Sequence, residues 1–131
     1  MSAADSRLLA RSAGVFFPGV AAAADRMRAL EGAESGGEMT IKPLVVAADM
    51  LLLEIFEAKG VRVPEHAHDD HESVVYLVKG SMKVVIGGEE FVARAGDAWL
   101  HPPGVRHWSE ALEDCVAIEV KSPPRKTWQA A

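Results

Sequence analysis

The sequence predicts an all-β protein, a single barrel or sandwich preceded by a short N-terminal helical arm. Three observations lead to this prediction. From residue 39 onward, short β-branched and apolar runs alternate with Gly, Pro and Asp turn signals at close spacing. The chain has 131 residues, enough for one domain with a buried core. No apolar run approaches the roughly 18 residues of a membrane-spanning helix, so we expect no membrane partner.

Composition narrows the class of protein further. Hydrophobic residues make up 49% of the chain and charged residues 25%, with a formal net charge of −5. A mildly acidic chain without a basic block argues against nucleic acid as a partner. Cys115 is the only cysteine, which excludes an intramolecular disulfide. The small-residue run 13–24 imitates a secretory signal only loosely, because Pro18 and Gly19 interrupt it, and we expect a cytoplasmic protein.

Residues 1–38 form the predicted arm, and residues 39–131 the predicted barrel domain. Residues 15–19 are a short apolar piece ended by a Pro-Gly pair, suited to packing on a neighbouring subunit. Residues 20–30 predict a helix, with Gly32 placed as its C-cap. One helical face would carry Val20, Ala23, Ala24, Met27 and Leu30.

The barrel domain contains about eight or nine predicted strands. Gly87-Gly88 is a tight hairpin signal, and Pro123-Pro124 ends the regular structure. Besides the histidine-rich stretch between Gly60 and Gly80, strands are predicted at 40–42, 44–46, 50–57, 81–86, 91–94, 98–101, 105–110 and 115–120.

The stretch from Gly60 to Gly80 carries the first candidate site. His66 and His68 are two residues apart, so on a strand both imidazoles face the same way. Imidazole is a common ligand of divalent transition metals, although an isolated His-x-His pair is more often two exposed histidines in a polar loop. Glu72 would add a carboxylate and produce a mixed shell that suits Fe, Mn, Ni or Zn.

Two further histidines lie in the stretch from residue 96 to 108. There a strand ends in Pro102-Pro103-Gly104, a turn that redirects the chain so that His107 can face back into the barrel. His101 stands at the end of that strand. Taken singly, His107 beside Trp108 is more often a packed or half-exposed histidine, and His101 is at least as often a strand-end residue as a pocket residue.

Together these residues resemble the two motifs of the cupin superfamily. Gly60, His66-x-His68, Glu72 and Gly80 are similar to the first motif, G-x5-H-x-H-x3,4-E-x6-G. After fifteen intervening residues, Gly96-x5-Pro102-x-Gly104-x2-His107 resembles the second motif, G-x5-P-x-G-x2-H-x3-N.

The sequence departs from these motifs at two positions. The final Asn of the second motif is Ala111 here. Seven residues, not six, separate Glu72 from Gly80, so counting back from Gly80 places Ser73 in the carboxylate slot. A bulge after Glu72 would restore Glu72 to that slot, and we favour this register because bulges are common near sites. Without the bulge, Ser73 faces inward and His71 or water completes the shell.

The resemblance implies a conical jelly-roll barrel with a divalent transition metal (Zn, Fe, Mn or Ni) in its wider mouth. It implies His66, His68, Glu72 and His107 as the metal ligands. Some small cupins act on sugar acids, so we expect a metal-dependent isomerase or lyase on a small oxygenated metabolite. In such an enzyme His101, Tyr76 or a metal-bound water moves the proton. A three-histidine shell would favour Fe-dependent dioxygenation. The alternative is a non-catalytic module that binds a small ligand or metal.

Open strand edges and the apolar arm together predict a homodimer.

Overall fold

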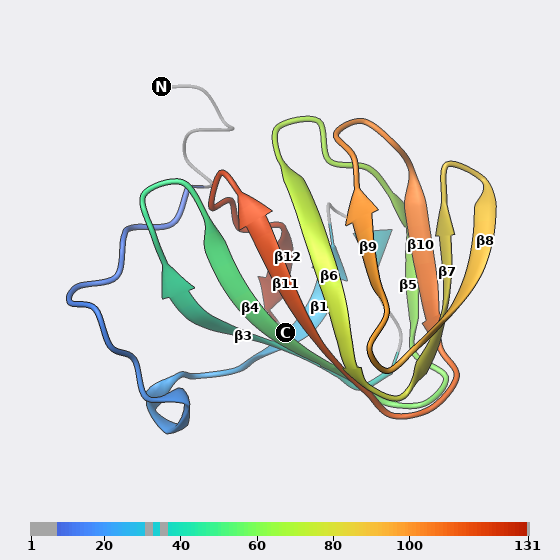
Figure 1. Ribbon diagram of the computed structural model, residues 1–131, viewed down its shortest axis with the longest axis horizontal. Helices are drawn as coiled ribbons and strands as arrows, with labels where there is room; N and C mark the ends of the chain where they lie inside the picture. Colours follow the sequence, from blue (N-terminus) through green and yellow to red (C-terminus); the bar gives the residue numbers. More distant parts are fainter. Residues whose placement is uncertain (1–7, 31–32, 35–36, 131) are drawn as a thin grey trace.

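The computed structural model describes residues 8–30, 33–34 and 37–130. In these ranges the chain forms antiparallel strands and one short 3-10 helix, η1 (Gly19–Ala21), so the predicted all-β fold is confirmed (Figure 1). No helix of the described residues is long and apolar enough to cross a bilayer. The strands are β1 (Asp25–Leu30), β2 (Ala33–Glu34), β3 (Met39–Val46), β4 (Leu51–Glu57), β5 (Arg62–His66), β6 (Glu72–Lys79), β7 (Ser81–Ile86), β8 (Glu89–Arg94), β9 (Ala98–His101), β10 (His107–Ala111), β11 (Cys115–Ser122) and β12 (Trp128–Ala130).

Two sheets build the barrel. The large sheet has the order β12-β1-β3-β4-β11-β6-β9, with β2 paired to β1, and the small sheet has the order β5-β10-β7-β8. Strands far apart in the sequence are neighbours, as in the pairing of β11 with both β4 and β6. In Figure 1 the strands β3, β4, β11, β6 and β9 form the front layer. This crossed connectivity is that of a jelly roll.

Alternation along the strands sets which side chains face the interior. In β4 every second residue from Leu51 to Glu57 is buried, and in β6 the buried positions run from Ser73 to Leu77. The turn between β6 and β7 requires glycine, because Gly80 has φ +95° and a Cβ there would lie 2.5 Å from the Asp114 carbonyl oxygen. The predicted hairpin at Gly87-Gly88 joins β7 to β8.

The predicted helix over residues 20–30 is wrong. Residues 25–30 form strand β1, which pairs with β3 and β12 in the large sheet. A helix of this length is marginal on its own, whereas the sheet supplies hydrogen-bond partners along the segment. Gly32, the predicted C-cap, lies outside the described residues. The two strands predicted around Pro43 are one strand, β3, whose register shifts between Pro43 and Val45 as a bulge.

The hydrophobic core between the sheets is divided into two clusters. One is centred on Ile41, Leu51 and Leu53, and the other on Leu77 and Val84. Residues of both clusters line one interior cavity, whose remaining lining is polar. The fold therefore encloses a chamber whose wall is largely apolar, with a group of polar and ionisable side chains facing into it.

Candidate metal centre

Three predicted histidines meet where the two motifs pair. His66 is the last residue of β5 and His107 the first of β10, and the two stand opposite each other in the sheet. His68 lies two residues beyond β5, in a loop tied to the Pro-Pro-Gly turn by a 2.7 Å hydrogen bond from the Gly104 amide to the His68 carbonyl. The residues that define the motifs thus hold the three side chains together.

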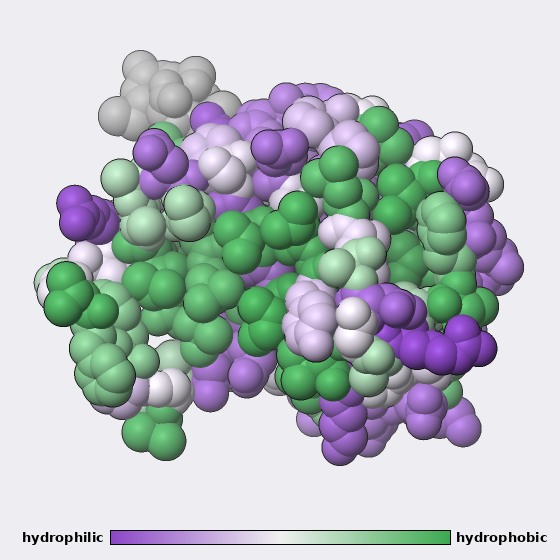
Figure 2. All heavy atoms as spheres, viewed as in Figure 1, coloured by the Kyte–Doolittle hydropathy of each residue, from purple (hydrophilic) through white to green (hydrophobic). Residues whose placement is uncertain are grey.

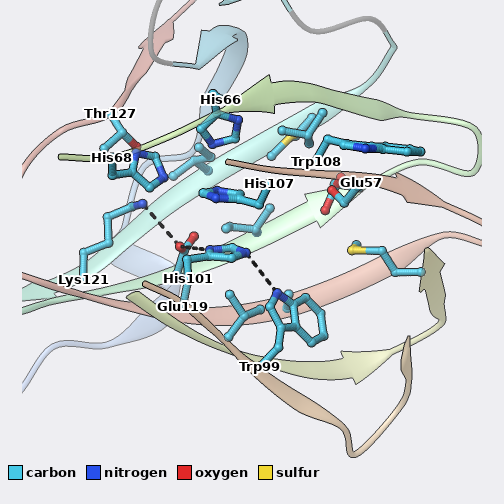
Figure 3. Close-up of a pocket in the computed structure, with 18 residues that line it drawn as sticks. Glu57, His66, His68, Trp99, His101, His107, Trp108, Glu119, Lys121 and Thr127 are labelled. Carbon is cyan, nitrogen blue, oxygen red and sulfur yellow. Dashed lines mark hydrogen bonds and ion pairs between the residues drawn. The ribbon is translucent and has the colours of Figure 1, made fainter. Parts of the chain in front are cut away.

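Each strand histidine is oriented by a nearby backbone carbonyl. His66 Nδ1 lies 2.8 Å from the Pro64 oxygen, and His107 Nδ1 lies 3.2 Å from the Val105 oxygen. Because a carbonyl only accepts, both Nδ1 atoms carry the proton and both Nε2 atoms hold a lone pair. These two Nε2 atoms are buried, and neither has a hydrogen-bond partner among the described residues. Figure 3 shows the rings gathered in the cavity.

The three histidines fit a metal ion. One ligand atom from each of His66, His68 and His107 lies within 4.8 Å of the others. Burial lowers the pKa of His66 to about 4 and that of His107 to about 3, and it lowers the pKa of His68 further. At neutral pH the imidazoles are therefore uncharged, which is the form that binds metal.

Glu72 does not join this cluster, contrary to the favoured register. Its side chain is exposed at the start of β6, whereas Ser73 is 1% exposed and faces the interior. The pairing of β6 with β11 is regular from Glu72 to Leu77, and the extra residue is taken up at Val78. The bulge thus lies at the far end of the strand and leaves Ser73 in the inward slot.

His71 is buried beside the cluster, but its ligand atoms are not part of the convergent group. Its ring centroid lies 4.3 Å from that of His68. Its Nδ1 lies 2.9 Å from Asp70 Oδ1. Arg125 holds the same carboxylate, with Nε 3.2 Å from Oδ2. His71 therefore packs against the triad from outside.

His101 lies inside the site and stacks on His107, with ring centroids 3.8 Å apart and planes at 7°. The indole Nε1–H of Trp99 donates to His101 Nε2 at 3.2 Å. Because an indole only donates, His101 Nε2 accepts, and the imidazole proton stands on Nδ1. That Nδ1 lies 3.1 Å from Ser73 Oγ and 3.7 Å from Glu119 Oε2.

A buried ion pair that the sequence interpretation missed completes the site. Glu119 and Lys121 face the interior from β11, and Lys121 Nζ donates to Glu119 Oε2 at 3.3 Å (Figure 3). Burial alone would raise the pKa of Glu119, but the Lys121 ammonium and hydrogen bonds from His101 and Ser73 hold that pKa well below its usual range. The sequence did contain a signal for this ion pair, because two opposite charges stand two residues apart, and so on one face, in an otherwise apolar strand.

The chamber has a volume of about 60 Å³. It reaches Glu57, whose Oε1 is buried without a hydrogen-bond partner among the described residues. Burial, reinforced by the charge of Glu119, raises the pKa of Glu57 to about 7. Tyr76, a predicted catalytic residue, is 49% exposed on the other face of the sheet and does not line the chamber.

Comparisons with known proteins agree with this geometry. Residues 52–121 match the sequence model of the family described as Cupin domain. Pectin degradation protein KdgF of Dickeya dadantii is 32% identical over 93 residues, which cover 70% of this chain and 84% of that protein.

Solved structures share the fold, among them the following two. The structure of KdgF from Halomonas sp. is 28% identical, with a TM-score of 0.65 over 67% of this chain and 81% of that one. An RmlC-like cupin from Shewanella frigidimarina is 26% identical, with a TM-score of 0.77 over 89% of this chain and 97% of that one. A family match over more than half of the chain, with both histidine motifs folded into one site, shows that the protein belongs to the cupin family.

Proposed function

We propose that this cupin is a metal-dependent enzyme that acts on a small oxygenated acid, with sugar acids as the favoured class. The observation that carries the proposal is the convergence of His66, His68 and His107 beside the buried Glu119–Lys121 pair. The relative in Dickeya dadantii that is 32% identical is named for pectin degradation, and pectin is a polymer of sugar acids.

The triad would hold a divalent transition metal through its histidine nitrogens. Zn, Fe, Mn and Ni all accept imidazole ligands, and their availability decides among them. A bound ion would supply Lewis-acid polarisation of ligand oxygens. Ser73 is a poor ligand for such ions, so the protein contributes three nitrogen donors and leaves room for oxygens of a small molecule.

The remaining polar residues of the chamber suit an acidic substrate. Among the described residues that line it, Lys121 is the only Lys or Arg. Its ammonium donates to Glu119 Oε2, and because an ammonium has three donors it can also donate to a substrate carboxylate. The lining residues are Met39, Ile41, Ile55, Glu57, Val63, His66, His68, Val75, Met82, Trp99, His101, His107, Trp108, Ser109, Ala117, Glu119, Lys121 and Thr127.

Glu119 is the group best placed to move a proton. It is ionised and buried beside His101, which stacks on His107 of the triad. Its low pKa makes the carboxylate a weak base, so it would accept a proton from a substrate whose acidity a bound metal ion had raised. The nitrogens of His101 are engaged by Trp99 on one side and by Ser73 and Glu119 on the other. We therefore propose that His101 positions Glu119 and does not itself contact the substrate.

The test is turnover of unsaturated uronates, followed by loss of their ultraviolet absorbance. We expect Glu119→Gln to lower turnover by about 100-fold or more while bound metal is retained. Glu54→Gln, on the outer face of β4, is the matched control and should leave turnover unchanged. Tight, saturable uronate binding without turnover in the wild type would instead support the non-catalytic binding module.

A second candidate, Fe-dependent dioxygenation, is favoured by one observation. Glu72 lies outside the site, so among the described residues the convergent ligands are three histidines and no carboxylate. Oxygen uptake by the iron-loaded protein with catechols and diketones tests this candidate. Oxygen uptake with no loss of uronate absorbance would replace the sugar-acid proposal by this one.

A further inference from the structure

A second buried carboxyl group, that of Glu57, faces the chamber. Among the described residues that line it, Glu57 and Glu119 are the only carboxylic acids. Glu57 ends the inward-facing row of β4, and its Oε1 atom is buried without a hydrogen-bond partner among the described residues. A buried polar atom that lacks a partner is costly, so such an atom calls for a bound molecule that pairs with it.

The large sheet places both acids on the side where apolar residues are expected. An antiparallel sheet with one solvated face normally alternates apolar residues inside with polar residues outside. Figure 2 shows hydrophobic residues gathered across the outer face of this sheet, and the register puts Phe56, the neighbour of Glu57, on that face. Glu57 and Glu119, which are 5% and 7% exposed, face the interior instead. Packing alone does not account for this arrangement, which favours a chemical role for both acids.

The two carboxyl groups stand in opposite electrostatic surroundings. In Figure 3 Glu119 lies at the Lys121 end of the chamber and Glu57 at the Trp108 end. Burial favours the neutral form of Glu119, but the Lys121 ammonium, 3.3 Å from Oε2, keeps the pKa of Glu119 well below its usual range. Lys121 is the only Lys or Arg among the described lining residues, and burial raises the pKa of Glu57 to about 7. Below that pH one chamber holds a carboxylate and a carboxylic acid, the arrangement by which enzymes assign a base and an acid.

Few other titratable groups face Glu57. On β11 these are Glu119, whose charge raises the pKa of Glu57 further, and Cys115, which pairs with Glu57 in register. Burial raises the pKa of the Cys115 thiol, so the thiol stays neutral. Beside the histidines, the strands β3, β5, β7 and β10 contribute lining residues without a titratable group, namely Met39, Ile41, Val63, Met82, Trp108 and Ser109. Burial and the charge of Glu119 therefore control the proton on Glu57.

We propose that Glu57 is the proton donor of this site, in an isomerisation in which Glu119 takes a proton from an oxygen of the substrate and Glu57 gives one to a carbon. This inference rests on the proposed function. In an unsaturated sugar acid with an enol group, Glu119 breaks the O–H bond, and the electron pair of that bond becomes the second bond of a C=O group. The electron pair of the C=C bond forms a new C–H bond with the proton of Glu57. Glu57 is left as a carboxylate and Glu119 as an acid, and water carries a proton back between them, so no oxidant or reductant is consumed.

The chamber leaves room for this transfer. Its volume of about 60 Å³ exceeds the roughly 10–15 Å³ that one water molecule needs. A general acid acts on an atom within hydrogen-bond reach or through one intervening water. Glu57 can therefore serve a substrate atom held near the triad, because both line the same chamber.

Turnover of unsaturated uronates by the metal-loaded full chain tests the proposal. Glu57→Gln keeps the size and the hydrogen bonding of the side chain but has no acidic proton, so we expect kcat to fall by about 100-fold with KM changed by less than about twofold. Bound metal and the circular dichroism spectrum should match the wild type. Glu57→Asp keeps the acid and should recover part of the lost kcat. Glu54→Gln, on the outer face of β4, is the matched control and should turn over at the wild-type rate.

The pH profile of kcat separates a proton donor from a structural residue. Because burial raises the pKa of Glu57 to about 7, the wild-type kcat should fall as the pH rises through that value and the donor loses its proton. Glu57→Gln has no such proton, so its residual kcat should not fall there, whereas Glu57→Asp should keep the fall.

Two results would overturn the proposal and leave the proposed function standing. One is a wild-type kcat in Glu57→Gln. The other is a lower kcat in that variant with the wild-type pH profile, which a structural role for Glu57 would produce. A wild type that turns over no uronate with Zn, Fe, Mn or Ni would overturn both the proton donor and the proposed function.

Discussion

The carboxyl group of Glu57 offers a quantitative test of how strongly the chamber is shielded from water. Glu57 is 5% exposed, and burial raises the pKa of its carboxyl group from 4.5 to about 7. Because the folded protein holds this proton more tightly than the unfolded chain, the stabilising contribution is full below pH 4.5 and is lost as the pH rises through about 7. The difference corresponds to about 3 kcal/mol of unfolding free energy above pH 7. Glu57→Gln keeps the shape and removes the ionisation.

We therefore expect Glu57→Gln to be more stable than the wild type at pH 8, by up to about 3 kcal/mol, and nearly equal to it at pH 4.5. Urea unfolding at the two pH values measures both differences, and comparing variant with wild type cancels the titration of the histidines. Glu54→Gln makes the same substitution on the outer face of β4 and serves as the control. A gain of equal size at both pH values, or no gain at pH 8, would refute the reasoning.

Three further predictions follow from the site. Lys121→Met leaves Glu119 as an uncompensated buried charge, so the free energy of unfolding in urea should fall by about 3–5 kcal/mol. Part of this loss should be recovered in the double variant that also carries Glu119→Gln. An unchanged urea midpoint in the single variant would contradict the buried ion pair. Glu72→Gln should leave bound metal unchanged in elemental analysis, since Glu72 is exposed outside the cluster, and loss of metal would restore Glu72 as a ligand. Burial lowers the pKa of His66 to about 4 and that of His107 to about 3, so below pH 6.5 the unfolded chain binds more protons than the folded protein. The metal-free protein should therefore lose stability as the pH falls from 6.5 towards 3. Dialysis at pH 5 should remove metal that the protein retains at pH 7.5.

The sequence was most informative where local chemistry restricts the backbone. The turn at Gly80 and the hairpin at Gly87-Gly88 have few conformational alternatives, so the strand boundaries around them could be predicted. The spacing of the two motifs identified His66, His68 and His107, which the structure brings together.

Which side chains of a strand face the interior was harder to predict, for a physical reason. In β11 the outward set, Val116, Ile118 and Val120, is apolar, whereas the inward set includes Glu119 and Lys121, so hydrophobicity alone predicts the opposite facing. The burial of Glu119 and Lys121 depends on their pairing with each other and with His101. In β6 the site of the bulge, at Val78, determines that Ser73 faces inward. Which side chains face inward depends on what covers the outer face of the large sheet and on pairing between strands that lie far apart in the sequence. The local sequence encodes neither.

The strand β1 illustrates the same limit. Residues 25–30 carry an apolar pattern compatible with a helix, and the competing state depends on β3 and β12, which lie far along the chain. Tertiary pairing overrides a weak local preference. The arm before β1 shows the converse, because Val15 and Phe16 are apolar and yet 96% and 82% exposed.

The central claim, that His66, His68 and His107 form one metal site, is tested most directly by elemental analysis of the purified protein and its variants. The account predicts a single divalent transition metal per chain in the wild type and its loss in the combined His66→Ala, His107→Ala variant. His71→Ala, which removes a buried histidine beside the triad, should retain the metal. Bound metal unchanged in the combined variant, with its fold intact by circular dichroism, would contradict the claim.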